Sequence, residues 1–285
     1  MSNQFHVGRG TARGALTVFP IWAEVVHPVS YSLDHTLAQV GERPDGPNVG
    51  SLAVLNTGGV PLLLLEGQLL EGGLQHRMVA RSTLLAPGQQ FMLDVVCVEH
   101  GRWQGAAGHA ARGRRVSNSV RSGLRAPDAQ NEVWRRVRRY EAERGPTATE
   151  SYVDHVERAD AAVRRLVRGL RPFPGQVGVL VGLAGQPLAA EIFDTPRMLA
   201  REFDEIVRAA AMDAVDLPPV ETPGRRARRF MYRADLVQRR PVAPAGIAEY
   251  VVGRDDYLDL SAVQWEGRAI HTLLTNRRHE LVLAA

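Results

Sequence analysis

Residues 60–103 read VPLLLLEGQLLEGGLQHRMVARSTLLAPGQQFMLDVVCVEHGRW and decide the fold of the N-terminal part of the chain. Three apolar segments, at 60–70, 74–85 and 90–99, are separated by Glu-Gly-Gly and Ala-Pro-Gly, which are turn sequences. A fourth apolar segment, SLAVLN at 51–56, precedes them across Asn-Thr-Gly-Gly. The series predicts an antiparallel β meander in which each of the four segments forms one strand.

The sequence that follows the meander changes character twice. Residues 104–127 lose apolar periodicity and are rich in Gly, Ala, Ser and Arg, so we expect a long surface loop. Apolar residues then recur at helical spacing, which predicts helices over 128–144, 150–170, 195–215 and 225–240. Around Gly185 the segments VGVLVGLAG and PLAAEIF predict a hairpin, and AEYVV, YLDLSAVQW, RAIHTLL and the terminal ELVL predict further short strands near the C-terminus.

These patterns predict an α+β protein. We expect an antiparallel β-rich lobe over 1–127, a pair of helices that connects the lobes over 128–171, and a mixed α/β lobe with antiparallel hairpins over 172–285. A chain of 285 residues is long enough for two lobes that bury their own cores.

Composition excludes several classes of protein. Hydrophobic residues make up 45% of the chain and charged residues 23%, which is typical of globular domains and not of disordered or collagen-like chains. The single cysteine, Cys97, has no partner for an internal disulfide bond. No apolar run reaches the roughly 18 residues that span a bilayer, and MSNQFHVGRG at the N-terminus lacks the apolar stretch of a signal peptide. We therefore expect a cytoplasmic protein without a membrane partner.

Positive charge is carried entirely by arginine and is unevenly distributed. The chain has 35 arginines, no lysine and a formal net charge of +4. Eleven arginines against four acids lie in 102–144, and seven against one lie in 225–240. Such clusters occur on surfaces that bind nucleic acids or other anions, and also on solvated faces of proteins from arginine-rich proteomes. Few aromatic residues accompany the arginines, so we expect a small anion as the main partner and nucleic acid as the alternative. Formation of a homo-oligomer is left open.

The turn at Glu-Gly-Gly gathers polar residues onto one hairpin. With Gly72 and Gly73 as a two-residue turn, Gln68 opposes Arg77. Since side chains alternate between the faces of a strand, Glu66 and Gln68 then share a face with Gln75 and Arg77. Glu66 lies diagonal to Arg77 in this register, within reach of a long side chain. The hypothesis of a ligand site here competes with a simpler one, in which Glu66 and Arg77 form an ion pair that fixes the register.

The third strand supplies the remaining candidates. Cys97 and Glu99 alternate onto one face, and Arg102 and Trp103 follow at the strand end. If the faces coincide, the carboxylates available for catalysis are Glu66 and Glu99, and Cys97 is a candidate nucleophile whose simpler role is that of a core residue. The candidate ligand-binding residues are Gln68, Gln75, Arg77, Arg102 and Trp103. Arginine forks beside an aromatic ring favour a phosphorylated molecule with a planar ring.

A metal site is not predicted. His76, His100, Cys97 and Glu99 lie close in sequence, but His100 and Cys97 fall on opposite faces of the strand and no recognised ligand spacing is present. The sequence contains no P-loop, dinucleotide-binding fingerprint, nucleophile elbow or zinc-protease motif, and it identifies no cofactor.

Several motifs together resemble one family. They are LTVFPI near the start, LLLLEGQLLEGGLQHR, VVCVEHGRW, and a hairpin that ends in AEIFDTP before a helix. The chain resembles a family of bacterial and archaeal domains named for association with ADP-ribosylglycohydrolases and rhodanese-like phosphatases, over most of its length. The family usually has Lys-Gln-Asn-Arg where this chain has Leu74-Gln75-His76-Arg77, so two of the four positions differ.

The resemblance implies a setting and no established reaction. It implies the processing or sensing of NAD-derived or ADP-ribose-like nucleotides. The positions that match the family's motifs are Glu66, Gln75, Arg77, Cys97, Glu99, Arg102 and Trp103.

We therefore expect a domain that binds or processes a phosphorylated small molecule, namely a nucleotide or a derivative of ADP-ribose or NAD. If it is an enzyme, two carboxylates beside anion-binding arginines fit hydrolysis or group transfer. The alternative is a non-catalytic module that binds nucleic acid or an acidic protein through 104–127 and the helix at 225–240. In a third interpretation, the polar strand face is buried and only fixes the fold.

Overall fold

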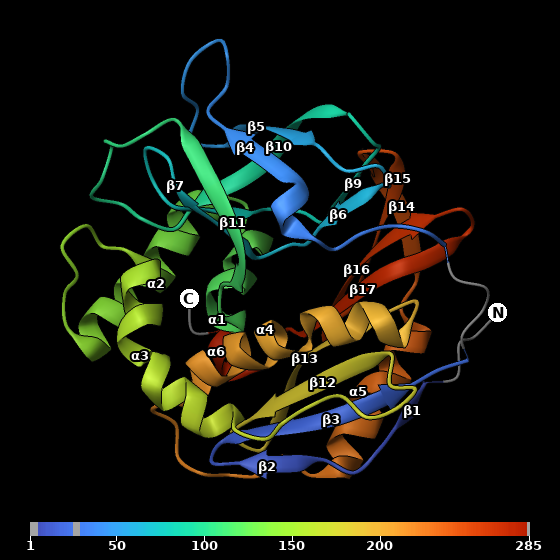
Figure 1. The fold of residues 1–285 in the computed structure, drawn as a ribbon. Helices are drawn as coiled ribbons and strands as arrows, with labels where there is room; N and C mark the ends of the chain where they lie inside the picture. The colour runs from blue at the N-terminus through green and yellow to red at the C-terminus, as the bar shows by residue number, and fades with distance from the viewer. Residues whose placement is uncertain (1–4, 25–28, 284–285) are drawn as a thin grey trace. The chain divides into compact units, whose positions relative to one another are not determined.

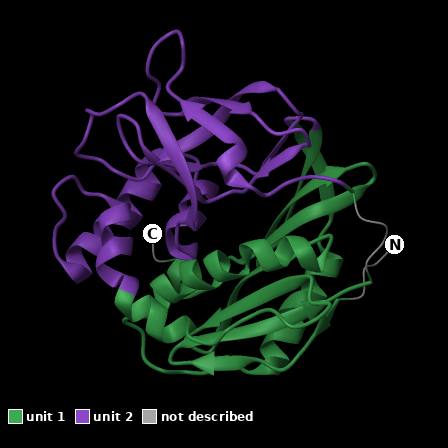
Figure 2. Cartoon of the chain, in the orientation of Figure 1, with its two compact units in different colours: residues 1–29, 161–244, 248–284 green, residues 30–160, 245–247, 285 purple. Residues whose placement is uncertain are grey.

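The computed structural model describes residues 5–24 and 29–283 and divides the chain into two compact units (Figure 2). Unit 1 contains residues 1–29, 161–244 and 248–284, and unit 2 contains residues 30–160 and 245–247. The fold is α+β with antiparallel sheets, as predicted. The unit boundaries differ from the predicted ones at 127 and 171, because the first strands of the chain pair with strands near residue 180. Pairing over such a separation has no signature in the local sequence.

Unit 2 is built on a closed barrel of six antiparallel strands (Figure 1). In spatial order these are β10 (Gln90–Cys97), β5 (Ser51–Asn56), β4 (Ala38–Gly41), β11 (Gly108–Arg115), β7 (Gln68–Gly72) and β8 (Arg77–Val79). Neighbouring β8 and β10 pair Val79 with Val95 and Arg77 with Cys97, which closes the circle. A short 3₁₀ helix, η1 (His35–Leu37), precedes β4.

The apolar segments at 60–70 and 74–85 each divide into two strands, where one was predicted. β6 (Leu62–Leu64) pairs with β9 (Thr83–Leu85) in a separate two-stranded sheet, while β7 and β8 join the barrel. Gly67 interrupts the first segment with φ of +83°, a left-handed conformation that glycine adopts without steric cost. Leu63 pairs with Leu84 and Leu70 with Arg77, so both parts keep a single register.

Most of residues 104–127 forms regular elements and not the predicted surface loop; 104–107 and 126–127 at its ends are irregular. They contain β11, helix α1 (Asn118–Ser122) and the 3₁₀ helix η2 (Gly123–Arg125). β11 pairs with both β4 and β7, so it completes the barrel. The sequence hides this strand because its Gly, Ala and Arg residues face solvent at alternate positions and carry little apolar signal.

Two longer helices follow close to their predicted positions. α2 (Ala129–Arg144) begins after Asp128, whose side chain accepts a hydrogen bond from the Asn131 N–H. α3 (Tyr152–Val167) follows, and the division between the two units falls within it, at 160/161. α2 buries Val133, Val137 and Tyr140, as its helical spacing predicts.

Unit 1 contains an antiparallel sheet of nine strands (Figure 1). Its spatial order is β1 (His6–Val7), β3 (Leu16–Trp22), β12 (Gly178–Leu183), β13 (Gln186–Phe193), β17 (Arg268–Asn276), β16 (Leu258–Trp265), β15 (Ala248–Arg254) and β14 (Arg239–Ala245). β2 (Thr11–Arg13) also pairs with β3.

Helices cover both faces of this sheet. α4 (Pro196–Ala214) packs on β3, β12 and β13 and begins after Thr195, whose hydroxyl accepts a hydrogen bond from the Met198 N–H. α5 (Gly224–Leu236) packs on β1, β13 and β16 through an apolar stripe that includes Phe230 and Met231. The predicted basic amphipathic helix therefore packs on its own sheet. A short helix, α6 (Glu280–Leu283), replaces a predicted terminal strand. Among the described residues, no helix is both long enough and apolar enough to cross a membrane.

Candidate functional site

The inward face of the unit 2 barrel is aliphatic along most of its length and polar at one end. Leu52, Val54, Leu70, Val79 and Val95 belong to one buried apolar cluster inside the barrel. Side chains two residues apart on a strand point to the same face. At this end of the barrel, the strands continue their inward faces with polar or reactive residues, each two positions beyond an aliphatic one. These residues are Arg77, Cys97, His109 and Glu42. We call Glu42, Gln75, Arg77 and His109 the polar end of the barrel.

Arg77 is a buried cation without a counter-ion. Its relative exposure is 0%, and its one hydrogen bond goes from Nη1 to Gln75 Oε1 at 2.8 Å. Nε and Nη2 are buried without a hydrogen-bond partner, and the described residues supply no ion pair for this side chain. A guanidinium does not lose its proton in proteins, so burial leaves the charge in place. Burying an unpaired charge costs several kcal/mol, which makes Arg77 the exceptional residue of this unit.

Gln75 and Trp103 hold and cover the Arg77 guanidinium. Gln75 Nε2 donates to the Glu99 carbonyl oxygen at 3.0 Å, which fixes its Oε1 as the acceptor that Arg77 uses. The Arg77 Cζ atom lies 5.7 Å from the centre of the Trp103 ring, within cation–π range. Trp103 is 49% exposed, so a large apolar ring lies between the guanidinium and solvent.

His109 and Glu42 complete the polar end. His109 Nε2 lies 3.2 Å from Glu42 Oε1, whereas His109 Nδ1 and Glu42 Oε2 are buried without a hydrogen-bond partner. Burial lowers the pKa of His109, and the contact with Glu42 offsets this only in part, so the imidazole is neutral at pH 7. Gly73 lies directly against the ring, because a Cβ atom there would come within 2.0 Å of His109 Nε2. Four buried polar atoms without partners thus lie in one region, including the two on Arg77.

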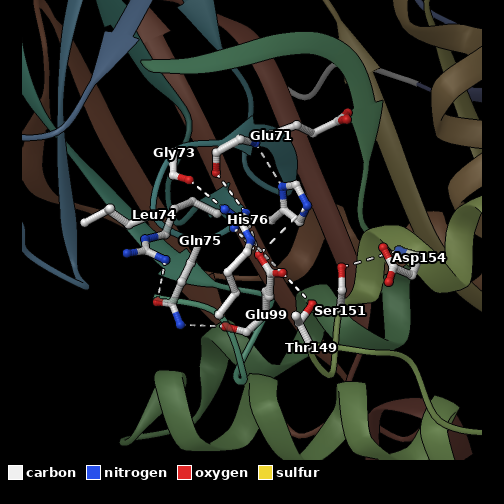
Figure 3. Close-up of polar contacts among 12 residues, drawn as sticks. Glu71, Gly73, Leu74, Gln75, His76, Glu99, Thr149, Ser151 and Asp154 are labelled. Atoms are coloured by element: carbon white, nitrogen blue, oxygen red, sulfur yellow. Dashed lines mark hydrogen bonds and ion pairs between the residues drawn. The ribbon is translucent and has the colours of Figure 1, made fainter. Parts of the chain in front are cut away.

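A second set of contacts surrounds Glu99 and is fully paired (Figure 3). Its carboxylate accepts hydrogen bonds from Arg102 Nε at 2.9 Å, Arg102 Nη2 at 2.7 Å, Thr149 Oγ1 at 2.6 Å and the His76 N–H at 2.9 Å. Arg102 also donates to the carbonyl oxygens of Gly72, Gly73 and Gln104. We call Glu99, Arg102, Thr149 and His76 the Glu99 clamp. It ties the loop after β7, the end of β10 and the segment before α3 together.

Hydrogen bonding keeps the carboxylate of Glu99 ionised. Burial by itself raises the pKa of a carboxyl group, but the hydrogen bonds from Arg102, Thr149 and the His76 N–H outweigh it and lower the pKa of Glu99. The His76 ring accepts a hydrogen bond from the Gly72 N–H at Nδ1, and burial lowers the pKa of this histidine. Glu99 is therefore a paired anion at neutral pH, with no oxygen left without a donor.

The remaining candidates occupy separate places. Cys97 is 0% exposed, its thiol lies 2.6 Å from the Glu99 carbonyl oxygen, and burial raises its pKa against the influence of Arg77. These properties are those of a core residue and not of an activated nucleophile. Glu66 is buried and accepts hydrogen bonds from Arg125 Nη2 at 2.7 and 3.0 Å. Gln68 Oε1 accepts from the Leu65 N–H at 3.3 Å and holds the turn before β7.

Comparison with known proteins identifies the family. A family model described as the ARG and Rhodanese-Phosphatase-superfamily-associated Protein domain matches residues 4–275. The chain belongs to this family, ARPP-1. No curated protein and no solved structure matches it. The resemblance inferred from the sequence motifs is thereby confirmed, and the polar end and the Glu99 clamp both lie within the ARPP-1 match.

The structure brings together part of the predicted site. Gln75, Arg77 and Trp103 meet at the polar end of the ARPP-1 barrel, and Glu99 with Arg102 forms the adjoining clamp. The predicted register is wrong by two residues, since Leu70 and not Gln68 opposes Arg77. The turn is wider than two residues because Gly72 pairs with His109 of β11 and Gly73 hydrogen-bonds to Gly108.

Glu66 does not make the predicted diagonal contact with Arg77. It precedes the left-handed Gly67, outside both β6 and β7, and its carboxylate pairs with Arg125. The four-group pocket that was expected from two acids and two arginines therefore does not form in the ARPP-1 chain, and the ion pair that would fix the register is absent too.

Three contributors were missed in the sequence. Glu42 and His109 were not identified because β4 and β11 were not predicted; once these strands are known, alternation from Val40 and Ala111 points to both residues. Thr149 lies fifty residues from Glu99 and has no local signal. In the described part of the ARPP-1 chain, no three His, Cys, Asp or Glu side chains are grouped to hold a metal ion. What the polar end offers chemically is two buried guanidinium donors beside an aromatic ring.

Proposed function

We propose that unit 2 binds a small phosphorylated molecule at the polar end of the barrel, with Arg77 as the anion ligand and Trp103 as the stacking surface. The observation that carries the proposal is the 0% exposure of Arg77 together with its two hydrogen-bond donors that have no partner. An anion would supply the missing counter-charge and accept both hydrogen bonds. Without an anion, the unpaired buried charge lowers the stability of the fold and gains no compensating contact.

The geometry also supports a nucleotide-like ligand over a bare anion. Trp103 offers a large exposed ring beside the guanidinium, and stacking on an aromatic side chain contributes about 1–3 kcal/mol per base. ADP-ribose and NAD derivatives combine an adenine ring with a diphosphate. The family's description names an association with ARG, the abbreviation for ADP-ribosylglycohydrolase, and this agrees with the ligand class. If the bound ligand is also a substrate, the reaction that we propose is hydrolysis or group transfer.

The test is thermal unfolding with ADP-ribose, AMP, inorganic phosphate and uncharged adenosine. Phosphorylated ligands should raise the unfolding temperature by several degrees, since a ligand at 100 times its Kd stabilises by about 2.7 kcal/mol. Arg77→Met should abolish the shift. Arg139→Met, which breaks only the exposed pair with Glu143, should preserve it. A shift of equal size in Arg77→Met would disprove the assignment, and chromatography of the incubated nucleotide would reveal turnover.

Helix α5 supports a second candidate function, binding of nucleic acid. Arg225, Arg228 and Arg229 are exposed on one side of the helix, and none has an acidic partner in the part of the chain that the structure describes. Tyr232 is 65% exposed on the same stripe. By contrast, Arg114 and Arg125 in the segment 104–127 pair with carboxylates, so the basic surface proposed here is limited to α5.

Binding of a short DNA duplex at two salt concentrations tests this second candidate. Affinity should fall steeply with salt, because each arginine that neutralises a phosphate releases counter-ions. Replacing Arg225, Arg228 and Arg229 with Gln should reduce that slope by about 3. Salt-independent binding, or an unchanged slope in the triple variant, would rule the helix out.

A further inference from the structure

Unit 1 contains a hollow on the face of its sheet that α4 covers. Its volume is about 250 Å³, and a second hollow of about 150 Å³ shares Leu170 and Phe203 with it. The larger hollow is lined by residues of β2, β3, α4 and the segment that follows α3: Thr11, Arg13, Val18, Pro20, Gly169, Leu170, Arg171, Phe173, Gln176 and Phe203. Asp204 and Arg208 line only the smaller hollow, and both hollows lie within unit 1. We call the larger hollow the groove.

The groove has an apolar lining and a positive rim. Val18, Leu170 and Phe203 supply aliphatic and aromatic surface. Arg13 and Arg171 are exposed, and neither has an acidic partner among the residues that the structure describes. Arg13 donates only to the Ala12 carbonyl oxygen, at 2.9 Å, and no acidic residue lines the larger hollow. This combination matches an amphipathic ligand whose charge is negative.

The wall of the groove is built and held in place. Gln176 Oε1 accepts a hydrogen bond from the Phe173 N–H at 2.9 Å, and Gln176 Nε2 donates to the Gly178 carbonyl oxygen at 2.8 Å. The Phe173 ring packs against Trp22 with the ring centres 6.2 Å apart, and Trp22 Nε1 donates to the Pro174 carbonyl oxygen. Phe173 is nonetheless 53% exposed, so an apolar ring held at this position has much of its surface in water.

We propose that this groove binds a small amphipathic carboxylate, with its hydrocarbon part against Leu170, Phe173 and Phe203 and its carboxylate on Arg13 and Arg171. The hydrocarbon would cover the exposed side of Phe173, which is favourable because apolar surface leaves water. The two guanidinium groups would take the carboxylate at the rim, where it stays partly hydrated. This site is independent of the polar end of the barrel, since every residue that forms it belongs to unit 1.

Titration of the whole chain with octanoate and with octan-1-ol tests the proposal. Heat of binding and Trp22 fluorescence provide two readouts, because Phe173 contacts that tryptophan. Octanoate should bind at least about 10-fold more tightly than the uncharged alcohol, since a charge-assisted hydrogen bond contributes about 1.5–3 kcal/mol. The Arg13→Gln/Arg171→Gln double variant should lose that difference and keep its affinity for octan-1-ol.

Two further variants separate this site from other surfaces. Arg165→Gln removes an exposed arginine of α3 that does not line the groove and should change nothing. Phe173→Ala should weaken both ligands, because it removes the apolar wall. Equal affinity for octanoate and octan-1-ol in the wild-type chain, no binding at millimolar concentration, or an unchanged preference in the Arg13/Arg171 double variant would each overturn the proposal.

Discussion

Arg77 and Arg102 come from the same stretch of sequence and lie in neighbouring parts of one unit, yet their surroundings differ completely. Arg102 uses all of its nitrogens, on the Glu99 carboxylate and on three carbonyl oxygens. Arg77 is more deeply buried and has one hydrogen bond. A buried charge that is fully paired fixes a fold, whereas one that is left unpaired destabilises it unless something else binds. The comparison therefore separates the structural arginine from the one available to a ligand.

The largest effect should come from breaking the Glu99 clamp on its positive side. Arg102→Met leaves the 2% exposed carboxylate of Glu99 without its counter-ion, and we expect a loss of about 3–5 kcal/mol in the free energy of unfolding. Urea unfolding measures this loss. Arg139→Met, which removes the exposed partner of Glu143, should cost about 0.3–0.5 kcal/mol. If the two variants lose equal stability, the clamp is not structural.

Gly73 tests the packing that separates the polar end from the Glu99 clamp. Gly73→Ala places a Cβ atom 2.0 Å from His109 Nε2 on a residue with φ of +58°, and we expect a loss of about 2–3 kcal/mol. Gly59→Ala, where a Cβ meets nothing within 4 Å, serves as the control and should stay within about 0.5 kcal/mol of the wild type. A neutral Gly73→Ala would mean that the imidazole moves away freely.

Arg77→Met should change the free energy of unfolding in the opposite direction to the two variants above. Removing a buried unpaired cation in favour of an apolar side chain of similar length should leave the free energy of unfolding unchanged or raise it by about 1–3 kcal/mol. The same urea experiment on ligand-free protein measures it. A loss comparable to that of Arg102→Met would show that Arg77 has a structural role, and the distinction between the two arginines would fail.

The smallest effect should appear in the pH dependence of stability. Because the pKa of Glu99 is lowered in the folded state, its contribution is complete above the ordinary glutamate pKa of 4.5 and is lost as the pH falls through the folded-state value. Glu99→Gln should lack this acid-dependent part of the unfolding curve. The lowered pKa of His109 adds a loss of stability that begins as the pH falls below 6.5. Identical acid profiles for the wild type and Glu99→Gln would contradict the paired state of Glu99.

Local patterns allowed much of the fold to be predicted and only part of the site. Helices α2, α4 and α5 were found from apolar spacing, and Thr195 and Asp128 lie at their starts as capping residues do. The motif residues Gln75, Arg77 and Trp103 were identified because polar residues in an apolar hairpin are conspicuous. Glu66 was grouped with them in error, since the left-handed turn at Gly67 redirects the chain and nothing in the residues around it signals that the strand ends.

The sequence by itself determined the antiparallel α+β class, the long helices and the positions of the chemically unusual side chains, because these depend on periodicity and residue type over short ranges. Only the tertiary structure decided which of those side chains are paired. β11 closes the barrel and brings His109 to the polar end, and Arg102 reaches Glu99 across a loop. Whether a charged side chain is paired depends on contacts between segments that are distant in the sequence. The same residue type can therefore stabilise the fold at one position and be available to a ligand at another.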